Sequence, residues 1–218
     1  IVATRAGYGP GDSWCVSVLE NDGFGSFSQG PKFCFPFPAS GYVLDATAAD
    51  VDADADADLV FTLTPDVAVA LNDGTGAFAP PVEYPASSDG LQLTIAELNG
   101  DGFPDLITAS SQAPGVSYLE NLGNAGSWLR FAAPVVLQAE GLVQGIAALD
   151  VDADLDLDVL SANLGSSEIA VLVNDGAGGF APDERLPAPS LPKRLRVADL
   201  TGDGTADLLG ASGAGSQQ

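Results

Sequence analysis

The sequence predicts an all-β protein, specifically a β-propeller built from four-stranded blades of about 50 residues. An acidic loop of one design begins at residues 50, 97, 150 and 199, so the repeat steps are 47, 53 and 49 residues. A glycine-rich turn motif keeps the same period, and the intervening segments are apolar, of strand length and without helical periodicity. A four-stranded unit repeated at this period is typical of propeller blades, which bury their faces by stacking on their neighbours.

The acidic loops are the element that says most about chemistry. Oxygen-bearing side chains occupy positions 1, 3, 5 and 9 of each loop, and an apolar strand follows directly. In a tight loop this alternation directs several carboxylates toward one centre, where they repel one another. A hard divalent cation that takes about six to eight oxygen ligands removes the repulsion, and Ca²⁺ is the usual one. We therefore expect one structural Ca²⁺ per loop, up to four in the chain.

The turn motif predicts β-hairpins. It reads Asn-Asp-Gly-x-Gly-x-Phe and begins at Asn21, Asn72 and Asn174. A further copy is stretched and runs from Asn121 to Phe131. Glycine supplies the positive φ that such a turn needs, and the trailing Phe is expected to pack between neighbouring sheets.

We expect one propeller domain, 1–218, or part of a larger one. The approximate repeat units are 1–40, 41–88, 89–139, 140–188 and 189–218. In the unit 89–139, strands are expected at 92–98, 106–110, 115–121 and 131–137.

The first and last units are predicted to be incomplete. Residues 1–4 align with the strand after an acidic loop, so the first unit lacks its innermost strand, and the last unit supplies two strands. A closed four-bladed ring, in which residues 193–200 complete the first unit, is one possible arrangement. The others are a fragment of a larger propeller and a homo-oligomer or filament built by strand complementation. We favour a fragment or an assembly unit over a self-contained ring.

Composition excludes several classes of function. The net charge is −23, from 30 acidic and 7 basic residues, which argues against nucleic acid and anionic membrane surfaces as partners. No segment approaches the ~20 apolar residues of a membrane span, so membrane insertion is not expected. There is no signal peptide and residue 1 is Ile, which indicates a mature or trimmed chain. The chain has no histidine, the commonest general base and zinc ligand.

The two cysteines, Cys15 and Cys34, flank the turn at 21–25 almost symmetrically. This spacing could place them opposite each other on paired strands, and a disulfide and two buried thiols both fit. Calcium loops of this kind favour the Ca²⁺-rich exterior, where disulfides persist. We therefore expect an extracellular or cell-surface location.

Taken together, the acidic loop Asp-x-Asp/Asn-x-Asp-Gly-x-x-Asp-Leu and the later Leu-Asn-x-Gly-x-Gly-x-Phe resemble the FG-GAP/VCBS repeat family. That family includes integrin α-subunit propellers, certain fungal lectins and many bacterial secreted proteins. The resemblance covers essentially the whole chain. It implies that each loop joins the innermost strand of a blade to the second strand and holds one Ca²⁺.

Carried over position by position, the resemblance implies four sets of side-chain ligands. They are Asp50, Asp52, Asp54 and Asp58; Glu97, Asn99, Asp101 and Asp105; Asp150, Asp152, Asp154 and Asp158; and Asp199, Thr201, Asp203 and Asp207. The residues at position 7 would each contribute a backbone carbonyl, and these are Asp56, Phe103, Asp156 and Thr205.

The four sets are not equivalent. Glu97 is longer than Asp and Thr201 is uncharged, so the second and fourth sites are expected to be weaker or hydrated. The family's glycine at position 6 is replaced by Ala55 and Leu155 in the first and third loops, where a positive φ would cost of order 1 kcal/mol. Those two loops carry four carboxylates each at the ligand positions, so we expect the tightest sites there.

The leading functional expectation is a non-enzymatic, calcium-stabilised propeller for adhesion, ligand binding or surface assembly. It would present a rigid platform to a protein or glycan ligand at a surface. The absence of histidine and of a nucleophile motif supports it.

Two alternatives stay open. One is a lectin, in which aromatic side chains stack on a sugar; the candidates are Trp14, Trp128, Tyr8 and Tyr118. The other is the propeller portion of a secreted polysaccharide-active enzyme. Its acids would be those outside the loops, namely Glu83, Glu140, Glu168, Asp183 and Glu184.

Overall fold

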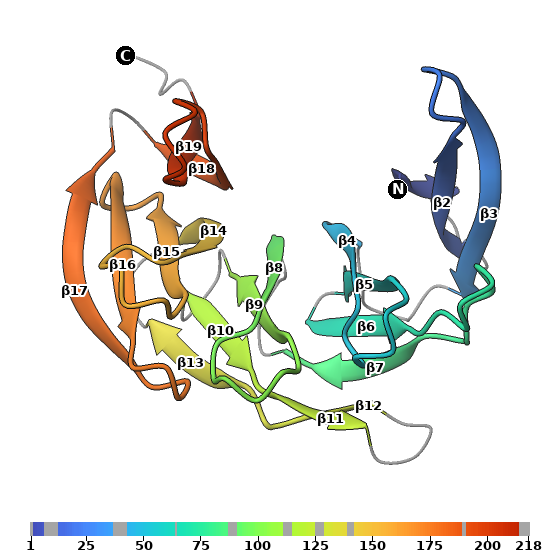
Figure 1. Ribbon diagram of the computed structural model, residues 1–218, viewed down its shortest axis with the longest axis horizontal. Coiled ribbons are helices and arrows are strands. Elements are labelled where there is room, and N and C mark those ends of the chain that lie inside the picture. Colours follow the sequence, from blue (N-terminus) through green and yellow to red (C-terminus); the bar gives the residue numbers. More distant parts are fainter. Residues whose placement is uncertain are drawn as a thin grey trace.

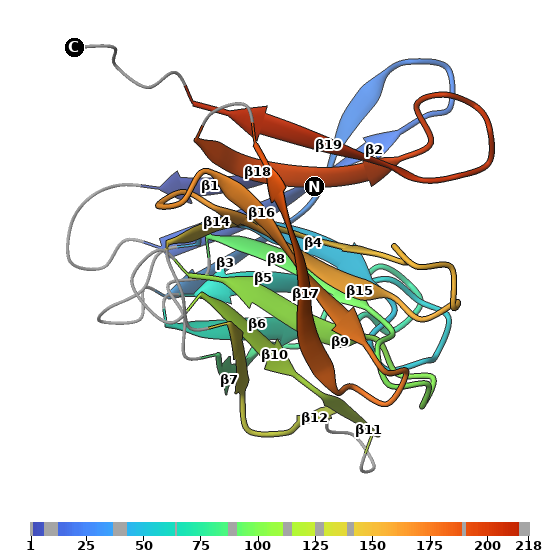
Figure 2. The same ribbon diagram turned by 90° about the vertical axis from the view of Figure 1, so that its left-hand side faces the viewer.

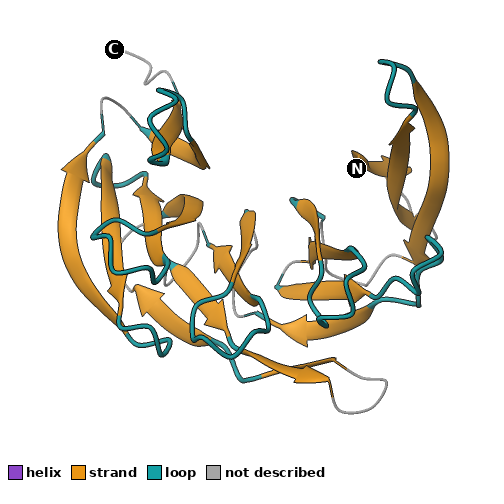
Figure 3. Cartoon of the chain, viewed as in Figure 1, coloured by secondary structure: helices purple, strands orange, loops and turns teal. Residues whose placement is uncertain are grey.

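The computed structural model describes residues 2–6, 13–36, 43–63, 65–86, 91–110, 115–124, 129–138, 142–188 and 191–213. Every regular secondary-structure element within these residues is a β-strand, as Figure 3 shows, so the all-β prediction is confirmed. None of them forms a helix long and apolar enough to cross a membrane. The described strands form six sheets; five of them follow one another in chain order along an open arc (Figure 1), and the sixth is a two-stranded hairpin beside the third.

The three central sheets have four antiparallel strands each. The second sheet contains β4 (Ala46–Ala49), β5 (Asp58–Leu63), β6 (Asp66–Ala70) and β7 (Val82–Pro85). The third contains β8 (Gln92–Ala96), β9 (Asp105–Ala109), β10 (Val116–Leu119) and β13 (Val135–Gln138). The fourth contains β14 (Val143–Leu149), β15 (Asp158–Asn163), β16 (Glu168–Asn174) and β17 (Phe180–Pro187).

The two sheets at the ends of the arc are smaller. The first sheet contains β1 (Val2–Ala6), β2 (Ser13–Asn21) and β3 (Phe27–Pro36), and the fifth contains β18 (Pro192–Ala198) and β19 (Asp207–Ser212). This matches the strand content expected of the incomplete first and last units.

The third sheet departs from the prediction in its last strand. Residues 129–131 do not join the sheet; they form β12 (Leu129–Phe131), which pairs with β11 (Asn121–Asn124) in a separate hairpin. The fourth strand of the sheet is β13, which pairs with β10. The stretched turn motif of this unit supplies the additional residues that make the hairpin possible.

The core consists of apolar side chains between successive sheets. Val60 of β5 and Leu106 of β9 lie in one buried cluster, so the second and third sheets pack face to face. Ile107 shares a second cluster with Val159 of β15, and Leu160 shares a third with Leu195 of β18. Adjacent residues on a strand thus face opposite neighbours, which explains why the strand after each central acidic loop is apolar on both faces.

The closed-ring arrangement is not formed. β18 pairs with β19 and, within the described residues, with no strand of the first sheet. Figure 1 shows the first and fifth sheets at the two separate ends of the arc. Residues 193–200 therefore do not complete the first unit within this molecule, and strand complementation between copies stays a prediction.

Of the two cysteine arrangements, the structure has the disulfide. Cys15 lies directly opposite Cys34 in the register of β2 and β3, and neither cysteine is free. The near-symmetric spacing about the turn at 21–25 produces this pairing, because that turn closes the hairpin between β2 and β3.

Candidate metal centres

All four acidic loops connect an inner strand to the next strand of the same sheet. They are the first loop (residues 50–58), the second (97–105), the third (150–158) and the fourth (199–207). Figure 2 shows them on one side of the arc, at the right of the view. The candidate centres therefore lie along a single edge of the molecule.

The acid at position 1 organises the first half of each loop. In the first loop the two carboxylate oxygens of Asp50 accept the backbone N–H of Asp54 and of Ala55, at 3.1 and 2.9 Å. In the third loop Asp150 accepts from Ala153 and Leu155 in the same way. These bonds curl the backbone around the carboxylate, so that the following side chains face inward.

The acid at position 9 attaches the loop to the turn motif of the same sheet. Asp58 is fully buried, and its oxygens accept the backbone N–H of Val51 at 3.0 Å and of Asn72 at 2.8 Å. Asp158 makes the equivalent bonds with Val151 and Asn174. The two repeated sequence motifs are thus parts of one structural unit.

The first and third loops each bring three carboxylates together. Asp50, Asp52 and Asp58 offer oxygen atoms that all lie within 4.8 Å of one another, and Asp150, Asp152 and Asp158 do the same. The acids at position 5 are not in these groups. In the first loop, for example, an oxygen of Asp54 accepts the backbone N–H of Asp56.

One oxygen in the first group has no partner. Oδ1 of Asp52 is buried and accepts no hydrogen bond. Burial raises the pKa of Asp52, the side chain of Asn124 lowers it in part, and the neighbouring charges of Asp54 and Asp50 raise it. Burial also raises the pKa of Asp58, with contributions from Asp52 and Asp54. A buried, unpartnered oxygen among crowded carboxylates fits a cation ligand, because a divalent cation would satisfy that oxygen and cancel the repulsion.

Every acidic loop requires a left-handed backbone at positions 4 and 6. In the first and third loops non-glycine residues adopt it: Ala53 (φ 61°), Ala55 (φ 76°), Ala153 (φ 64°) and Leu155 (φ 80°). In the second and fourth loops the residues are Gly100, Gly102, Gly202 and Gly204, with φ between 75° and 88°. The predicted strain at Ala55 and Leu155 is confirmed, and position 4 adds a second strained residue to each loop.

The acids of the second loop accept several hydrogen bonds from the loop itself. Glu97 accepts the backbone N–H of Asn99, Gly100 and Gly102, at 3.1, 2.9 and 2.6 Å. The amide group of Asn99 donates to Asp101 at 3.4 Å and lies 3.5 Å from an oxygen of Glu120. An N–H donor therefore stands where the first loop has the carboxylate of Asp52.

Asp105, at position 9 of the second loop, receives one more donor than its counterparts. Besides the backbone N–H of Leu98 and Asn121, it accepts the hydroxyl of Tyr118 at 3.2 Å. The corresponding residues in the other central sheets are Val69 and Val171, which have no hydroxyl. Burial raises the pKa of Asp105 to about 7, so this carboxylate is easily neutralised by a proton.

The fourth loop, like the second, has no group of three acids within 4.8 Å, although both loops are described throughout. Asp199 accepts the backbone N–H of Gly202 and Gly204, and these bonds lower its pKa. The pKa of Asp203 is lowered mainly by the backbone N–H of Thr205. Asp207 accepts from Leu200 and Thr201.

The asparagine of the turn motif has a role that sequence reasoning missed. The amide of Asn121 donates to the carbonyl of Pro104 in its own sheet and to that of Val51 in the first loop. Asn174 likewise donates to Leu157 and, across the sheets, to Leu98 of the second loop. Each of these asparagines ties its sheet to the acidic loop of the preceding one. The sequence signal for this role was the recurrence of Asn at a nearly constant number of residues after position 9 of the acidic loop.

Position 7 presents its side chain to the glycine of the turn motif. A Cβ on Gly74 would collide with the carboxylate of Asp56, and one on Gly176 would collide with Asp156. In the second loop the ring of Phe103 lies over Gly123. These side chains therefore point away from the group of three acids, and the backbone carbonyl of position 7 is the atom proposed to face the ion.

The structure removes one of the four aromatic candidates for sugar stacking. Tyr118 is buried, with its hydroxyl bonded to Asp105 and its ring edge-on to Phe180, so the prediction of an exposed platform is wrong for this residue. Tyr8 and Trp128 lie outside the described residues, as does the side chain of Trp14.

The acids outside the loops show no assembled catalytic pair among the described residues. Glu168 forms an ion pair with Arg185 at 3.3 Å, and Glu83 is exposed. Glu140 and the side chains of Asp183 and Glu184 lie outside the described residues.

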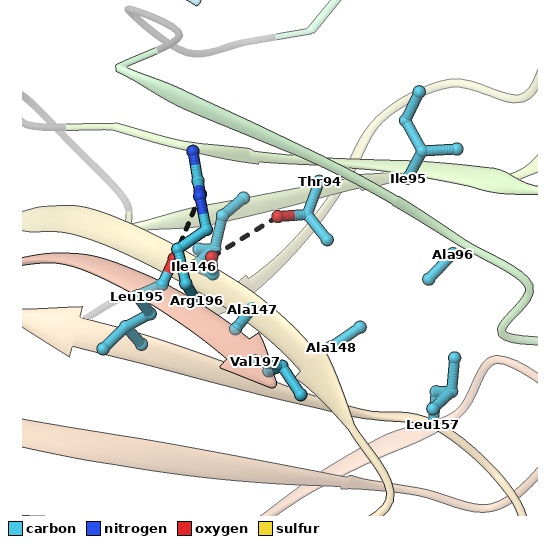
Figure 4. A pocket seen from close by; sticks show the side chains of 10 residues that line it. All are labelled: Thr94, Ile95, Ala96, Ile146, Ala147, Ala148, Leu157, Leu195, Arg196 and Val197. Atoms are coloured by element: carbon cyan, nitrogen blue, oxygen red, sulfur yellow. Dashed lines mark hydrogen bonds between the residues drawn. The ribbon is translucent and has the colours of Figure 1, made fainter. Parts of the chain in front are cut away.

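Two of the pockets in the described part of the chain are lined mainly by residues outside the acidic loops. The first, of 250 Å³, lies between β8, β14 and β18 and is lined mainly by small aliphatic side chains (Figure 4). Its polar members bond to the backbone: Thr94 donates to Ile146, and Arg196 donates to the carbonyl of Leu195. The second, of 390 Å³, is an apolar hollow between β6, β7 and β12, where Tyr84 donates to the carbonyl of Leu129.

Comparison with protein families is decisive for the repeat. Residues 98–161 and 150–210 each match the profile of the FG-GAP-like repeat, and together they span more than half of the chain. The chain belongs to the FG-GAP-like repeat family. The two FG-GAP-like matches contain the third and fourth loops and all but the first residue of the second. No match was found among curated protein sequences.

Solved structures of similar fold share little sequence with this FG-GAP-like chain. A complex of BBS1N with ARL6DN, soaked with lead, aligns with a TM-score of 0.56 and 13% identity, covering 96% of this chain and 57% of that one. An Agrocybe aegerita lectin that recognises non-reducing terminal N-acetylglucosamine gives 0.47 and 18%, covering 96% and 74%. A Photorhabdus luminescens Tc holotoxin pore gives 0.38 and 17%, covering 94% and 12%. The chain thus spans little more than half of the matched chain of that complex, and the likeness concerns the fold alone.

Proposed function

We propose that the chain is all or part of an extracellular, calcium-stabilised β-propeller that acts as a non-enzymatic binding module in adhesion or surface assembly. Each sheet is one blade, and the acidic loops hold structural Ca²⁺ along one edge. FG-GAP-like membership and the radial order of the sheets support the propeller. The ion fixes the loops, and the surface of the rigid arc carries recognition.

The single observation that carries calcium binding is the group formed by Asp50, Asp52 and Asp58. Three carboxylates share one small volume, and Oδ1 of Asp52 is buried without a partner. Leaving such a group without a counter-charge is costly, and a hard cation supplies the charge. The third loop, with Asp150, Asp152 and Asp158, has the same arrangement.

The extracellular location is supported by the disulfide between Cys15 and Cys34. Disulfides form and persist in oxidising compartments, which are also the compartments rich in Ca²⁺. The net charge of −23 is compatible with a secreted surface and is lowered in magnitude by bound cations.

Thermal unfolding tests the calcium proposal. The chain is unfolded in excess Ca²⁺, in excess EDTA, and in EDTA with Mg²⁺ as the control for ionic strength and charge. At an ion concentration ~100 times the dissociation constant, each site contributes about 2.7 kcal/mol, so a clear rise in melting temperature is expected with Ca²⁺ alone. Identical melting curves in Ca²⁺ and EDTA would overturn the proposal.

The preferred alternative among binding functions is carbohydrate recognition. It is supported by the apolar hollow between β6, β7 and β12, whose walls include Pro80, Pro81 and Val82 and suit the C–H face of a sugar ring. Binding to a glycan array should then be lost when Val82 is replaced by Glu. A wild-type chain that binds no glycan on the array would rule this alternative out, and turnover of any glycan would contradict the non-enzymatic proposal.

A further inference from the structure

We propose that the acidic loops are of two kinds: the first and third are held by a divalent cation, whereas the second and fourth are held by their own hydrogen bonds and need no ion. This inference rests on the proposed calcium binding and refines it, because the repeated motif by itself assigns one ion to every loop. The evidence comes from three positions at which the loops differ.

Position 3 decides whether a third carboxylate is present. Asp52 and Asp152 complete their groups of three, and Oδ1 of Asp52 is left unpartnered. At the same position Asn99 turns its amide donor toward Asp101, with Glu120 near the limit of hydrogen-bonding distance. The amide oxygen of Asn99 accepts the backbone N–H of Asp101 and is neutral, so the ligand positions of the second loop carry one negative charge fewer than those of the first.

Position 9 distinguishes the second loop alone, since Asp207 of the fourth loop accepts two backbone N–H groups, from Leu200 and Thr201. Asp58 and Asp158 each accept two backbone N–H groups. Asp105 accepts two backbone N–H groups and, in addition, the hydroxyl of Tyr118. The buried carboxylate of the second loop thus has one more internal donor than Asp58 and Asp158.

Positions 4 and 6 determine the conformational strain energy of the folded loop. The second and fourth loops use glycine, which adopts a positive φ without steric penalty. The first and third loops force Ala53, Ala55, Ala153 and Leu155 into the same region, where an L-residue is strained. A loop that is strained and holds three close carboxylates has the most to gain from an external ligand, and a loop with glycine at these positions and no such group has the least.

Hydrogen exchange resolves the loops individually in the intact chain. Amide exchange is followed by mass spectrometry in excess Ca²⁺ and in excess EDTA. Peptides covering 51–57 and 151–157 are expected to lose about 100-fold protection in EDTA, which corresponds to a site held at ~100 times its dissociation constant. Peptides covering 98–104 and 200–206 are expected to change less than about 2-fold.

The possible outcomes separate this inference from the proposed function. If no loop responds to Ca²⁺, calcium binding itself is refuted. If the second or fourth loop responds as strongly as the first and third, calcium binding stands and the division into two kinds is refuted.

Matched variants sharpen the assignment. Asp152→Asn and Glu168→Gln each remove one negative charge from the fourth sheet, but Glu168 pairs with Arg185 outside the loop. Only Asp152→Asn should abolish the calcium response of 151–157. An equal loss in both variants would show that net charge, and not the assembled group, binds the ion.

A conversion variant tests the second loop in the opposite direction. Asn99→Asp together with Tyr118→Phe restores a carboxylate at position 3 and removes the hydroxyl donor from Asp105. Exchange of residues 98–104 should then become calcium-dependent. A folded double variant with no calcium response in this segment would contradict the proposed role of the internal donors.

Discussion

The first and second acidic loops follow the same backbone course and differ in what offsets their negative charge. In the first, Asp50, Asp52 and Asp58 crowd together and one oxygen has no partner. In the second, Asn99 and Tyr118 supply donors to the acids around them. The difference shows that a repeated motif preserves the shape of a loop more faithfully than its chemistry, because an ion and a hydrogen-bond donor can stabilise the same shape.

The largest effect is expected from breaking the group of three acids in the first loop. Asp52→Asn should lower the free energy of unfolding in saturating Ca²⁺ by up to about 2.7 kcal/mol, because one ion site is lost. Asp56→Asn is the matched control, since its side chain lies against Gly74 and outside the group. Urea unfolding in Ca²⁺ and in EDTA measures both variants. Equal effects of the two substitutions would count against a defined site.

The next effect concerns the asparagines that connect the sheets. Asn174→Ala removes amide bonds to Leu157 at 3.0 Å and to Leu98 at 2.7 Å, whereas Asn72 has one such bond, to Ala57 at 3.1 Å. Asn174→Ala should cost about 2 kcal/mol of unfolding free energy, and Asn72→Ala about half of that. Denaturant titration of both variants measures the two losses of unfolding free energy. A larger loss for Asn72→Ala than for Asn174→Ala would contradict the role of the bond to the preceding loop.

Removing the internal donor of the second loop should have a smaller effect. Tyr118→Phe keeps the ring against Phe180 and deletes the hydroxyl bond to Asp105, at a cost of about 1–2 kcal/mol. The control is Tyr84→Phe, whose hydroxyl donates to a backbone carbonyl outside the loops. Unfolding in Ca²⁺ and in EDTA should show the same cost of Tyr118→Phe in both conditions. A cost that appears in EDTA and disappears in Ca²⁺ would mean that an ion already occupies the second loop.

Backbone strain gives the smallest expected change. Leu155 is 89% exposed, so Leu155→Gly relieves its left-handed backbone with little loss of packing and should stabilise the calcium-free chain by about 1 kcal/mol. Gly102→Ala should destabilise it by a similar amount. Melting temperatures in EDTA check both signs, and destabilisation by Leu155→Gly would show that the strain argument is wrong.

The sequence was sufficient for much of the fold because the fold is built from local patterns. Apolar runs and Asn-Asp-Gly turns predicted the strands of the third sheet, apart from the shift that produced β12. They also predicted three strands in the first sheet and two in the fifth. The need for a positive φ at Ala55 and Leu155 was equally local, since position 6 is glycine in the other two loops.

What the sequence could not predict depends on contacts between distant segments. The bond from Asn121 to Val51 spans 70 residues and exists only because adjacent sheets stack in a fixed register. Tyr118 was a candidate for sugar stacking, and its true position became clear only when β10 was placed beside Asp105. The closed ring, one of the arrangements that the sequence left open, is not formed, because β18 pairs with β19 and with no strand of the first sheet in the described residues.

The number of tightly bound calcium ions tests the central claim most directly. Native mass spectrometry of the intact chain, after exchange into a calcium-containing volatile buffer with EDTA-treated protein as the reference, counts the ions per molecule. We predict two tightly bound calcium ions per molecule, one in the first loop and one in the third. A chain that carries four ions, or none, would contradict it.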